Sequence, residues 1–193
     1  MLSYKESLKI LKKTDALLEG HFILSSGLRS EKYIQCAKLL SKPKEAKELC
    51  LSLAEKIKEK FKNIDLILSP AIGGIVIGYE IGRILGLETI FAERVNENFQ
   101  LRRGFEIKQG QKILIVEDVI TTGKSSFECS NLGSKVGAEV VGYACLIDRS
   151  NGKSKINKQI VSQVEINIPT YKEEEIPKHL KDKKAIKPGS RNL

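Results

Sequence analysis

The segment ILIVEDVITTGKSS, residues 113–126, constrains the fold of this chain more than any other. It begins as an apolar run, reaches two adjacent acids, Glu117 and Asp118, and then passes through a short polar turn into a helical pattern. Such an apolar run is typical of a strand that is buried on both faces of a parallel sheet. A strand that leads through a turn into a helix is the repeating unit of α/β proteins. The segment therefore predicts an α/β fold.

The same alternation continues on both sides of this segment. Short apolar runs predict strands at 65–69, 88–92, 112–117 and 139–147. Helical periodicity predicts helices from Ser41 or Pro43 to Ile57, over 71–85 and over 124–136. We expect a mostly parallel central sheet that is covered by helices on both faces.

The ends of these elements carry their own signals. Ser3 and Glu6 match a capping box at the start of a short first helix, and Gly86 is expected to end the helix over 71–85. The stretch 19–35 is polar and is expected to be irregular, and the stretch 94–104 is polar without periodicity, so no element is predicted there. The lysine-rich stretch 172–193 is expected to be peripheral, with a short element around 173–180.

A chain of 193 residues is long enough for one domain with a sizeable core. Its 33 Lys and Arg against 24 Asp and Glu leave a formal net charge of +9. Such a surplus favours polyanionic partners: nucleic acid, an anionic membrane surface or a phosphate-rich small molecule. No helix-turn-helix, zinc or aromatic–basic RNA motif is recognisable, and neither a Walker A pattern nor a strand-linked G-x-G-x-x-G occurs. Charge alone does not choose among these partners.

The four cysteines, Cys36, Cys50, Cys129 and Cys145, stand far apart and form no C-x-x-C pair. We expect free, mostly buried thiols in a reducing compartment, although two disulfides are arithmetically possible. The N-terminus lacks an apolar signal-peptide core. The most apolar stretch, 64–81, contains Asp65, Glu80 and three glycines, which makes it a poor membrane span. A cytoplasmic protein without a membrane partner is the expectation.

The turn after the two acids has the chemistry of a phosphate site. The free N–H groups and the dipole of a helix N-terminus favour an anion, and Gly123 allows the backbone to approach it closely. Two acids beside an anion need another role, such as binding sugar hydroxyls, a magnesium ion or developing positive charge. Together these parts describe a phosphorylated sugar. The alternative is a structural turn in which the acids cap the helix.

VEDVITTGKS resembles the phosphoribosyl-pyrophosphate signature of the type I phosphoribosyltransferases. Four further segments resemble the orotate branch of that family and occur in the family's order. They are EGHFILSSGLRS (19–30), SPAIGGIVIGYEIGR (69–83), FAERVNENFQLRRGF (91–105) and LIDRSNG (146–152). With the signature they span residues 19–152.

This resemblance implies a type I phosphoribosyltransferase fold in one domain, 1–193. A small hood would come from about 1–42 and the C-terminal part, and the core from about 43–152. The implied reaction is transfer of phosphoribosyl from 5-phospho-α-D-ribose 1-diphosphate to orotate, giving orotidine 5′-phosphate and diphosphate in pyrimidine biosynthesis. It implies Mg²⁺ carried mainly by the diphosphate, no metal ligands on the protein and no nucleic-acid partner. It also implies a homodimer in which loop 93–104 reaches the other subunit.

The residues expected to act in this site fall into three groups. Catalysis is assigned to Glu117, Asp118, Arg94, Arg102 and Arg103. The sugar donor is assigned to Gly73, Gly74, Arg94, Glu117, Asp118, Val119, Ile120, Thr121, Thr122, Gly123, Lys124 and Ser125. Orotate is assigned to Ser25, Tyr33, Thr121 and Arg149.

Two of these assignments also have a physical basis in the residues themselves. The amides of Gly73 and Gly74 follow a strand end, where they can form a nest for diphosphate oxygens, and close helix–sheet packing is the alternative. Arg149 follows the strand 139–147, and its forked guanidinium suits a planar carboxylate such as that of orotate. An arginine at a strand exit is otherwise solvated.

The chain lacks basic residues of the family's pattern at three places. Val95–Phe99 lacks the lysine and histidine that longer members carry in this loop, Gly73 replaces a usual lysine, and Ser25 replaces another. We therefore expect the loop arginines to act instead, and the alternative is a charged surface hairpin. Two other functions stay open: a type I phosphoribosyltransferase that uses a purine base, and a non-catalytic regulator with the same fold that binds nucleic acid.

Overall fold

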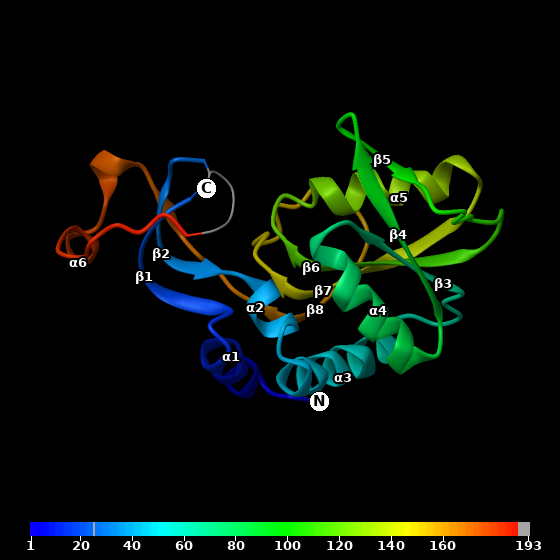
Figure 1. Cartoon of the computed structure of the whole chain (residues 1–193), viewed down its shortest axis with the longest axis horizontal. Coiled ribbons are helices and arrows are strands. Elements are labelled where there is room, and N and C mark those ends of the chain that lie inside the picture. The colour runs from blue at the N-terminus through cyan, green and yellow to red at the C-terminus, as the bar shows by residue number, and fades with distance from the viewer. Residues whose placement is uncertain (25, 189–193) are drawn as a thin grey trace.

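The computed structural model describes residues 1–24 and 26–188 (Figure 1). In this part of the chain the larger sheet has six strands in the order β5-β4-β3-β6-β7-β8. Neighbouring strands are parallel except for β5, which is antiparallel to β4. The strands are β3 Leu66–Pro70, β4 Glu88–Val95, β5 Asn98–Leu101, β6 Lys112–Ile120, β7 Glu139–Asp148 and β8 Ile160–Glu165. The predicted mostly parallel α/β sheet is confirmed.

The apolar run of β6 is buried on both sides of this sheet. Leu114 and Val116 belong to the core cluster beneath helices α3 (Pro43–Lys60) and α4 (Gly73–Leu85). Ile113 and Ile115, which alternate with them, belong to the cluster on the opposite face, where α5 (Lys124–Lys135) packs. Successive side chains of a strand point to opposite faces, so a continuous apolar run is required where both faces are covered.

The helix boundaries follow local signals. Helix α1 (Tyr4–Lys13) begins with the predicted capping box: the Glu6 N–H donates to Ser3 Oγ, and the Ser3 N–H donates to Glu6 Oε2 at 2.7 Å. Helix α4 ends at Gly86, whose φ of 70° is left-handed. None of the helices in the described ranges is both long and apolar enough to cross a membrane.

A second, smaller sheet forms the hood on the left of Figure 1. It pairs β1 (Leu17–Ile23) with β2 (Arg29–Ile34), and β2 with β9 (Thr170–Tyr171), all antiparallel. The expectation of an irregular stretch over 19–35 is therefore wrong. Strand β1 pairs with β2, its neighbour in sequence, but β2 also pairs with the distant β9, a contact that no local pattern indicates. The short helix α2 (Cys36–Leu40) joins the hood to the core.

The C-terminal segment also contributes to the hood. Helix turns occur at Glu173–Glu175 (η1) and Lys178–Lys181 (α6), inside the short element predicted there. Further on, Ile186 pairs with β1, because its N–H donates to the His21 carbonyl oxygen and its own carbonyl accepts from Ile23. His21 is buried, and its Nδ1 lies 3.1 Å from the Lys183 carbonyl oxygen, which agrees with a structural histidine.

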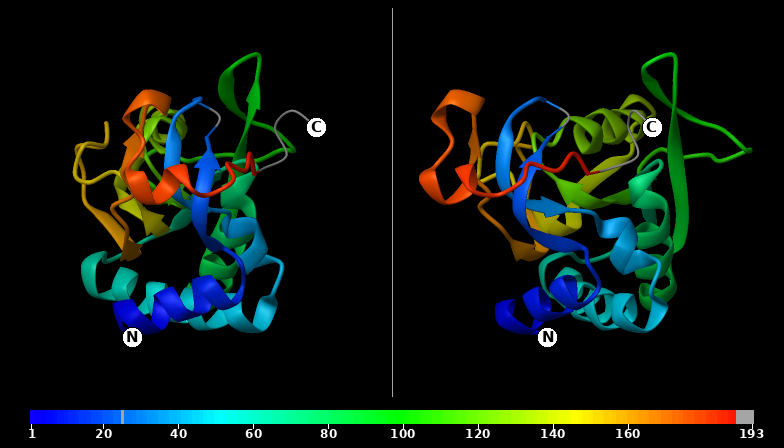
Figure 2. Two further views of the ribbon diagram at one scale, coloured as in Figure 1. Left: turned by 90° about the vertical axis from the view of Figure 1, so that its left-hand side faces the viewer. Right: turned by 60° about the vertical axis from the view of Figure 1, so that its left-hand side comes forward.

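The stretch 94–104, for which no element was predicted, is a β-hairpin over most of its length, in agreement with the alternative of a charged surface hairpin. Strands β4 and β5 pair from Ala92–Leu101 to Val95–Asn98, and the connection, Asn96 and Glu97, has positive φ at both residues. Two such residues form the tight turn that suits strand twist. The hairpin projects beyond the rest of the sheet (Figure 2). Sequence analysis also missed β8, which extends the sheet past residue 152.

Candidate active site

The acid pair, Glu117 and Asp118, lies on β6, which sits between β3 and β7. The strand continues to Ile120, so the turn begins three residues later than predicted, because Val119 and Ile120 still pair with β7. Ligands of open α/β sheets bind beyond the carboxyl ends of the strands. The acids are thus at the edge where a ligand is expected.

Burial controls the charge of both acids. It raises the pKa of Glu117 to about 7, although the Ser126 hydroxyl donates a hydrogen bond to the carboxylate. Burial also raises the pKa of Asp118, whose Oδ1 accepts the N–H of Val119 at 2.9 Å. Two adjacent carboxylates that are held out of water are a source of negative potential, and they are stabilised when positive charge develops nearby.

We expect Glu117→Gln to raise stability at pH 8. The folded-state pKa of Glu117 lies above its ordinary value of 4.5, so this group lowers stability as the pH rises from that value through about 7. Removing the charge is expected to add up to about 3 kcal/mol to the free energy of unfolding at pH 8. Urea unfolding at pH 5 and pH 8 measures it. The gain should shrink towards zero at pH 5, and equal stabilities at pH 8 would contradict the assignment.

The turn after β6 presents a helix N-terminus to this edge. Gly123 is the N-cap of α5 with φ 70°, and a Cβ there would lie 2.9 Å from Ile156 Cγ1. Both the conformation and the space therefore require glycine. Thr121, Thr122 and Lys124 are exposed. The Lys124 N–H donates to Thr122 Oγ1 at 3.3 Å, and with a glycine cap the N–H groups that follow it in the first turn can bind an anion. The turn has the geometry of a phosphate site.

Gly73 and Gly74 bring α4 against β6. A Cβ on Gly73 would lie 2.8 Å from Asp118 Oδ1, and one on Gly74 would lie 3.1 Å from the Val116 carbonyl oxygen. Close helix–sheet packing, the alternative reading of these glycines, thus describes their surroundings. It also places the start of α4 directly beside the acid pair. Their role in binding diphosphate stays a prediction.

Arg149 lies at the exit of β7, next to the turn. Its N–H donates to the Ile120 carbonyl oxygen at 2.8 Å, which ties the two strand exits together. The side chain is half-buried, its Nε has no hydrogen-bond partner among the described residues, and burial lowers the pKa of the guanidinium. A buried donor without a partner is unfavourable unless a ligand supplies the acceptor.

The hood reaches the same region. The thiol of Cys36, at the start of α2, lies 3.9 Å from the Asp118 carbonyl oxygen. Tyr33 is three residues earlier on β2, and its ring centre lies 5.8 Å from that of Phe22. Tyr33 thus lies on β2 of the hood, three residues before the cysteine that contacts Asp118. The remaining predicted hood residue, Ser25, lies outside the described residues.

The three hairpin arginines do not contact the acid pair. Arg103 and Arg102 pair with Glu93, at 2.6 Å and 3.4 Å, and Arg94 pairs with Glu128 of α5 at 2.7 Å. The hairpin therefore holds its cations on its own acids and on α5. Their predicted action on the diphosphate requires these pairs to open.

Comparison with known proteins identifies the family. A model of the phosphoribosyl transferase domain matches residues 37–183, most of the chain. The chain belongs to the phosphoribosyltransferase family.

Relatives of this phosphoribosyltransferase confirm the resemblance to the orotate branch. The chain is 46% identical over 193 residues, 100% of both chains, to the orotate phosphoribosyltransferase of Parvibaculum lavamentivorans. It is 49% identical over 181 residues, 93% of this chain and 92% of the relative, to that of Sphingopyxis alaskensis.

Solved structures agree on the fold. The orotate phosphoribosyltransferase of Aeropyrum pernix matches with a TM-score of 0.72 and 24% identity, covering 82% of this chain and 92% of that one. An adenine phosphoribosyltransferase from Thermoanaerobacter pseudethanolicus matches with a TM-score of 0.59 and 19% identity, covering 70% and 88%. The predicted type I phosphoribosyltransferase fold is confirmed.

Two residues that contact predicted site residues were not found by the sequence analysis. Ser126 donates to Glu117, one position beyond the predicted phosphate turn. Glu128 pairs with Arg94 and lies four residues after Lys124, whose Nζ is 3.7 Å away. The i, i+4 spacing of Lys124 and Glu128 was a usable signal. The pairing of Arg94 with Glu128 gave no such signal, because it depends on the position of the hairpin.

Proposed function

We propose that this chain transfers the phosphoribosyl group from 5-phospho-α-D-ribose 1-diphosphate to orotate, giving orotidine 5′-phosphate and diphosphate. The observation that carries the proposal is the acid pair Glu117–Asp118 at the exit of β6, followed directly by the phosphate turn and packed against the start of α4. This arrangement provides a place for the ribose hydroxyls and for a phosphate within a few residues of each other. The curated relatives of near-equal length carry the name of this activity.

The acid pair explains how the reaction is accelerated. The bond from ribose C1 to the diphosphate oxygen breaks while a bond from C1 to N1 of orotate forms, and positive charge develops on the ribose ring. The N1 proton of orotate passes to the departing diphosphate or to water. Glu117 and Asp118 hold the ribose hydroxyls and stabilise that charge in a site shielded from water. The turn 121–125 anchors the 5′-phosphate, so the sugar is oriented before the bond breaks.

Arg149 serves the base. Its partly buried guanidinium offers two parallel N–H donors to the carboxylate of orotate, a contact that a base without this group does not make. The buried Nε without a described partner supports this assignment. Tyr33 of the hood supplies an aromatic wall for the pyrimidine ring. Specificity for orotate thus comes from one charge-assisted contact and one stacking surface.

We expect Arg149→Ala to raise the KM for orotate about tenfold or more, because a charge-assisted bidentate contact contributes a few kcal/mol. The KM for the sugar donor should change little. Steady-state kinetics with each substrate varied in turn measures both. Lys158→Ala, which removes an exposed cation from the loop before β8, is the control. A rise in the donor KM instead would assign Arg149 to the phosphate side.

Magnesium fits this site as part of the substrate. No cluster of three or more metal-ligating side chains occurs in the described ranges, but two carboxylates stand at the ligand edge. Mg²⁺ keeps several waters and binds through one or two carboxylates together with substrate phosphates. When bound, it neutralises charge on the leaving diphosphate. Glu117 and Asp118 are the residues available to contact it or its waters.

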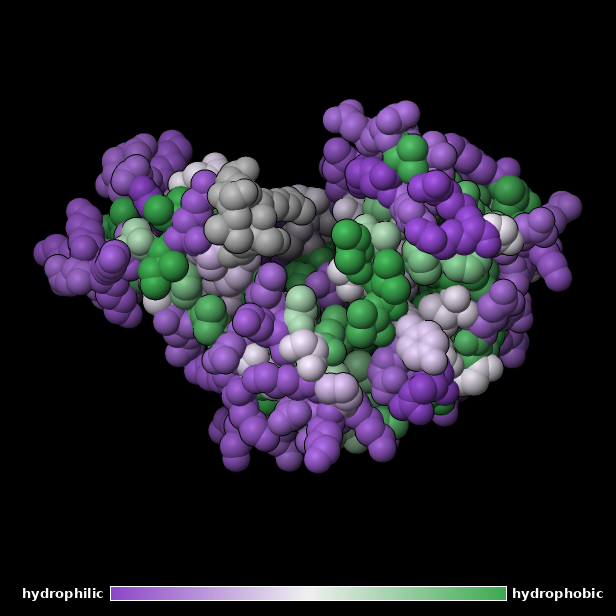
Figure 3. Space-filling view, in the orientation of Figure 1, coloured by the Kyte–Doolittle hydropathy of each residue, from purple (hydrophilic) through white to green (hydrophobic). Residues whose placement is uncertain are grey.

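A homodimer is the proposed assembly, with loop 93–104 of each subunit reaching the other site. Ile72, the N-cap of α4, and Val76 and Tyr79 on the helix itself are 86%, 52% and 65% exposed. Figure 3 shows hydrophobic side chains gathered over this helix in the middle of the visible face. A contiguous exposed apolar patch is typical of an interaction surface. Because α4 begins beside Asp118, a second copy seated on this face would lie close to the acid pair.

A reducing compartment, the cytoplasm, is the proposed location. All four cysteines are free and buried, as predicted from their spacing. Free thiols that are buried fit a core that folds without disulfides.

One assay tests the function directly. Orotate absorbs in the near ultraviolet, and its loss is followed on adding the sugar donor and Mg²⁺. Loss of the orotate band that requires both additions is the expected result. The same assay with a panel of purine bases tests the alternative activity. Turnover of a purine without turnover of orotate would overturn the proposal.

A further inference from the structure

Glu128 of α5 holds two cations at once. Its Oε2 lies 2.7 Å from Nη2 of Arg94, on the hairpin, and its Oε1 lies 3.7 Å from Nζ of Lys124, in the first turn of α5. Both cations are among those assigned to the anionic sugar donor. One carboxylate therefore occupies the two groups that the substrate phosphates need.

The hairpin is docked on α5 around this carboxylate. The guanidinium carbon of Arg94 stacks 4.2 Å from the centre of the Phe99 ring, and Arg94 also donates to the Glu97 carbonyl oxygen. Phe99 itself is buried in the core cluster beneath the hairpin. The contact therefore has an apolar part, which fixes the hairpin, and an ionic part, which fixes the arginine.

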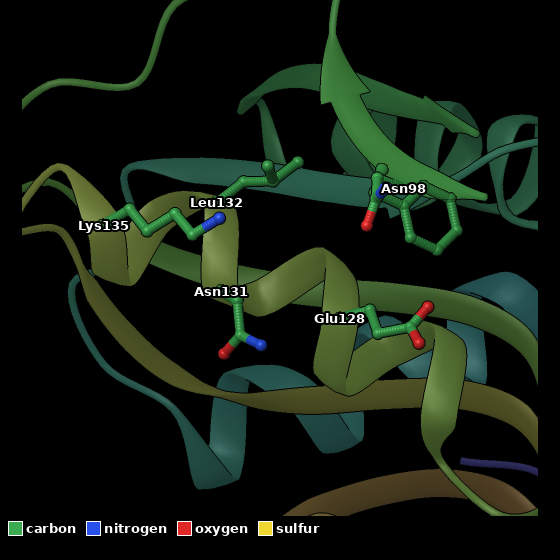
Figure 4. A pocket seen from close by; sticks show the side chains of 6 residues that line it. Asn98, Glu128, Asn131, Leu132 and Lys135 are labelled. Atoms are coloured by element: carbon green, nitrogen blue, oxygen red, sulfur yellow. The ribbon is translucent and has the colours of Figure 1, made fainter. Parts of the chain in front are cut away.

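The ionic part of the contact is open to solvent. A cavity of about 150 Å³ lies beside Glu128, between β5 and α5, and Figure 4 shows the side chains around it. It is lined by Asn98, Phe99, Glu128, Asn131, Leu132 and Lys135. The side chains of Arg94 and Glu128 are 37% and 31% exposed. An ion pair with this exposure is weak enough for a competing anion to open it.

We infer that Glu128 is a positioning residue that keeps Arg94 and Lys124 in place while the site is empty and yields them to the substrate phosphates. The hydrogen bond from Arg94 lowers the pKa of Glu128, so the carboxylate is charged at neutral pH. A diphosphate carries more charge and more acceptor oxygens than one carboxylate, and it therefore replaces Glu128 as the partner of these cations. The inference rests on the proposed function, because that function supplies the competing anion.

Glu128→Gln tests the exchange, since it removes the charge and keeps the shape. The KM for the sugar donor is expected to fall about two- to fivefold, which corresponds to the small free energy of one or two exposed ion pairs. The kcat and the KM for orotate should stay within about twofold of wild type. Glu128→Asp keeps the charge and should restore most of the wild-type KM. Glu139→Gln makes the same charge change at the start of β7, where no ion pair is described, and should leave all three constants unchanged.

Ionic strength separates this explanation from a packing effect. The difference in donor KM between Glu128→Gln and wild type should shrink as salt is added, because the Debye length falls from about 10 Å at 0.1 M to about 3 Å at 1 M. A donor KM that stays equal or rises in Glu128→Gln at low salt would overturn the inference. So would a fall of the same size in Glu139→Gln, since it would reflect net charge alone.

Hydrogen exchange of the empty protein gives a readout that does not require turnover. Opening the ion pair should speed amide exchange across 94–101 in Glu128→Gln. Inorganic diphosphate, which binds the freed Arg94, should slow exchange of this segment, and it should do so at a lower concentration in Glu128→Gln than in wild type. If orotate is not a substrate but these exchange changes occur, the proposed function fails and the inference about Glu128 stands. Unchanged exchange in both experiments would overturn the inference even in an active enzyme.

Discussion

Asp118→Asn is expected to lower turnover at least about a hundredfold, because it removes a charge that stabilises the transition state. The loss should appear in kcat rather than in the KM for either substrate, since positive charge on the ribose exists only as the bond to diphosphate breaks. Initial rates at saturating orotate and sugar donor measure it. A wild-type kcat in the variant would refute the role of the acid pair.

The fold should survive this change. Oδ1 of Asp118 accepts the N–H of Val119, and an amide oxygen can do the same. Burial raises the pKa of Asp118, so the charged form is not favoured by the fold, and the variant should melt at or above the wild-type temperature. Asp65→Asn is the matched control: Asp65 Oδ2 accepts the Lys112 N–H at 2.8 Å, just before β3 at the opposite edge of the sheet. Its turnover should be unchanged.

The parts of the fold that were predictable are those set by neighbours in sequence. The capping box of Ser3 and Glu6, the stop at Gly86 and the apolar run of β6 all depend on contacts or packing patterns within a few residues. The parallel sheet followed from their order, because strands that alternate with helices have few other arrangements.

The hood and the hairpin were not predictable in this way. Strand β2 pairs with β9 through Arg29 and Tyr171, which are far apart in sequence, and it carries charged residues on both faces. The position of the hairpin depends on the burial of Phe99 against α5. The polar sequence around Phe99 does not predict this burial. Strand β8 was missed because it lies in a lysine-rich and glutamine-rich stretch beyond the family's motifs.

The residues of the candidate site also differ in whether local sequence or tertiary contacts determine their position. Glu117, Asp118 and the turn 121–125 were found because one continuous segment carries both the strand and the helix start. Ser126 and Cys36 approach the acids only in the folded chain. The pairing of Arg94 with Glu128, which changes the expected behaviour of the loop, is also a tertiary contact. Sequence thus predicted the placement of the acids and of the turn better than the tertiary contacts that restrain them.

The second large effect concerns the hairpin arginines. Changing Arg94, Arg102 and Arg103 together to Ala should abolish most activity, because they are the cations available to clamp the diphosphate as it leaves. If the hairpin acts on the partner's site, mixing this triple variant with Asp118→Asn should restore activity. In a mixed dimer one site combines a wild-type acid pair with a wild-type hairpin, and the other combines both defects. Random exchange should therefore recover roughly a quarter of full activity by counting sites.

The design separates the two possible arrangements of the loop. A hairpin that acts on its own subunit gives no active site in the mixed dimer, since each subunit carries one defect. Recovery must be measured after subunit exchange has been demonstrated, for example with two affinity tags. The triple variant must also keep the wild-type melting temperature, because Arg94 packs on Phe99. Absence of recovery under these conditions would contradict the proposed reach of loop 93–104 into the other subunit, while leaving the acid pair and its chemistry as argued from Asp118→Asn.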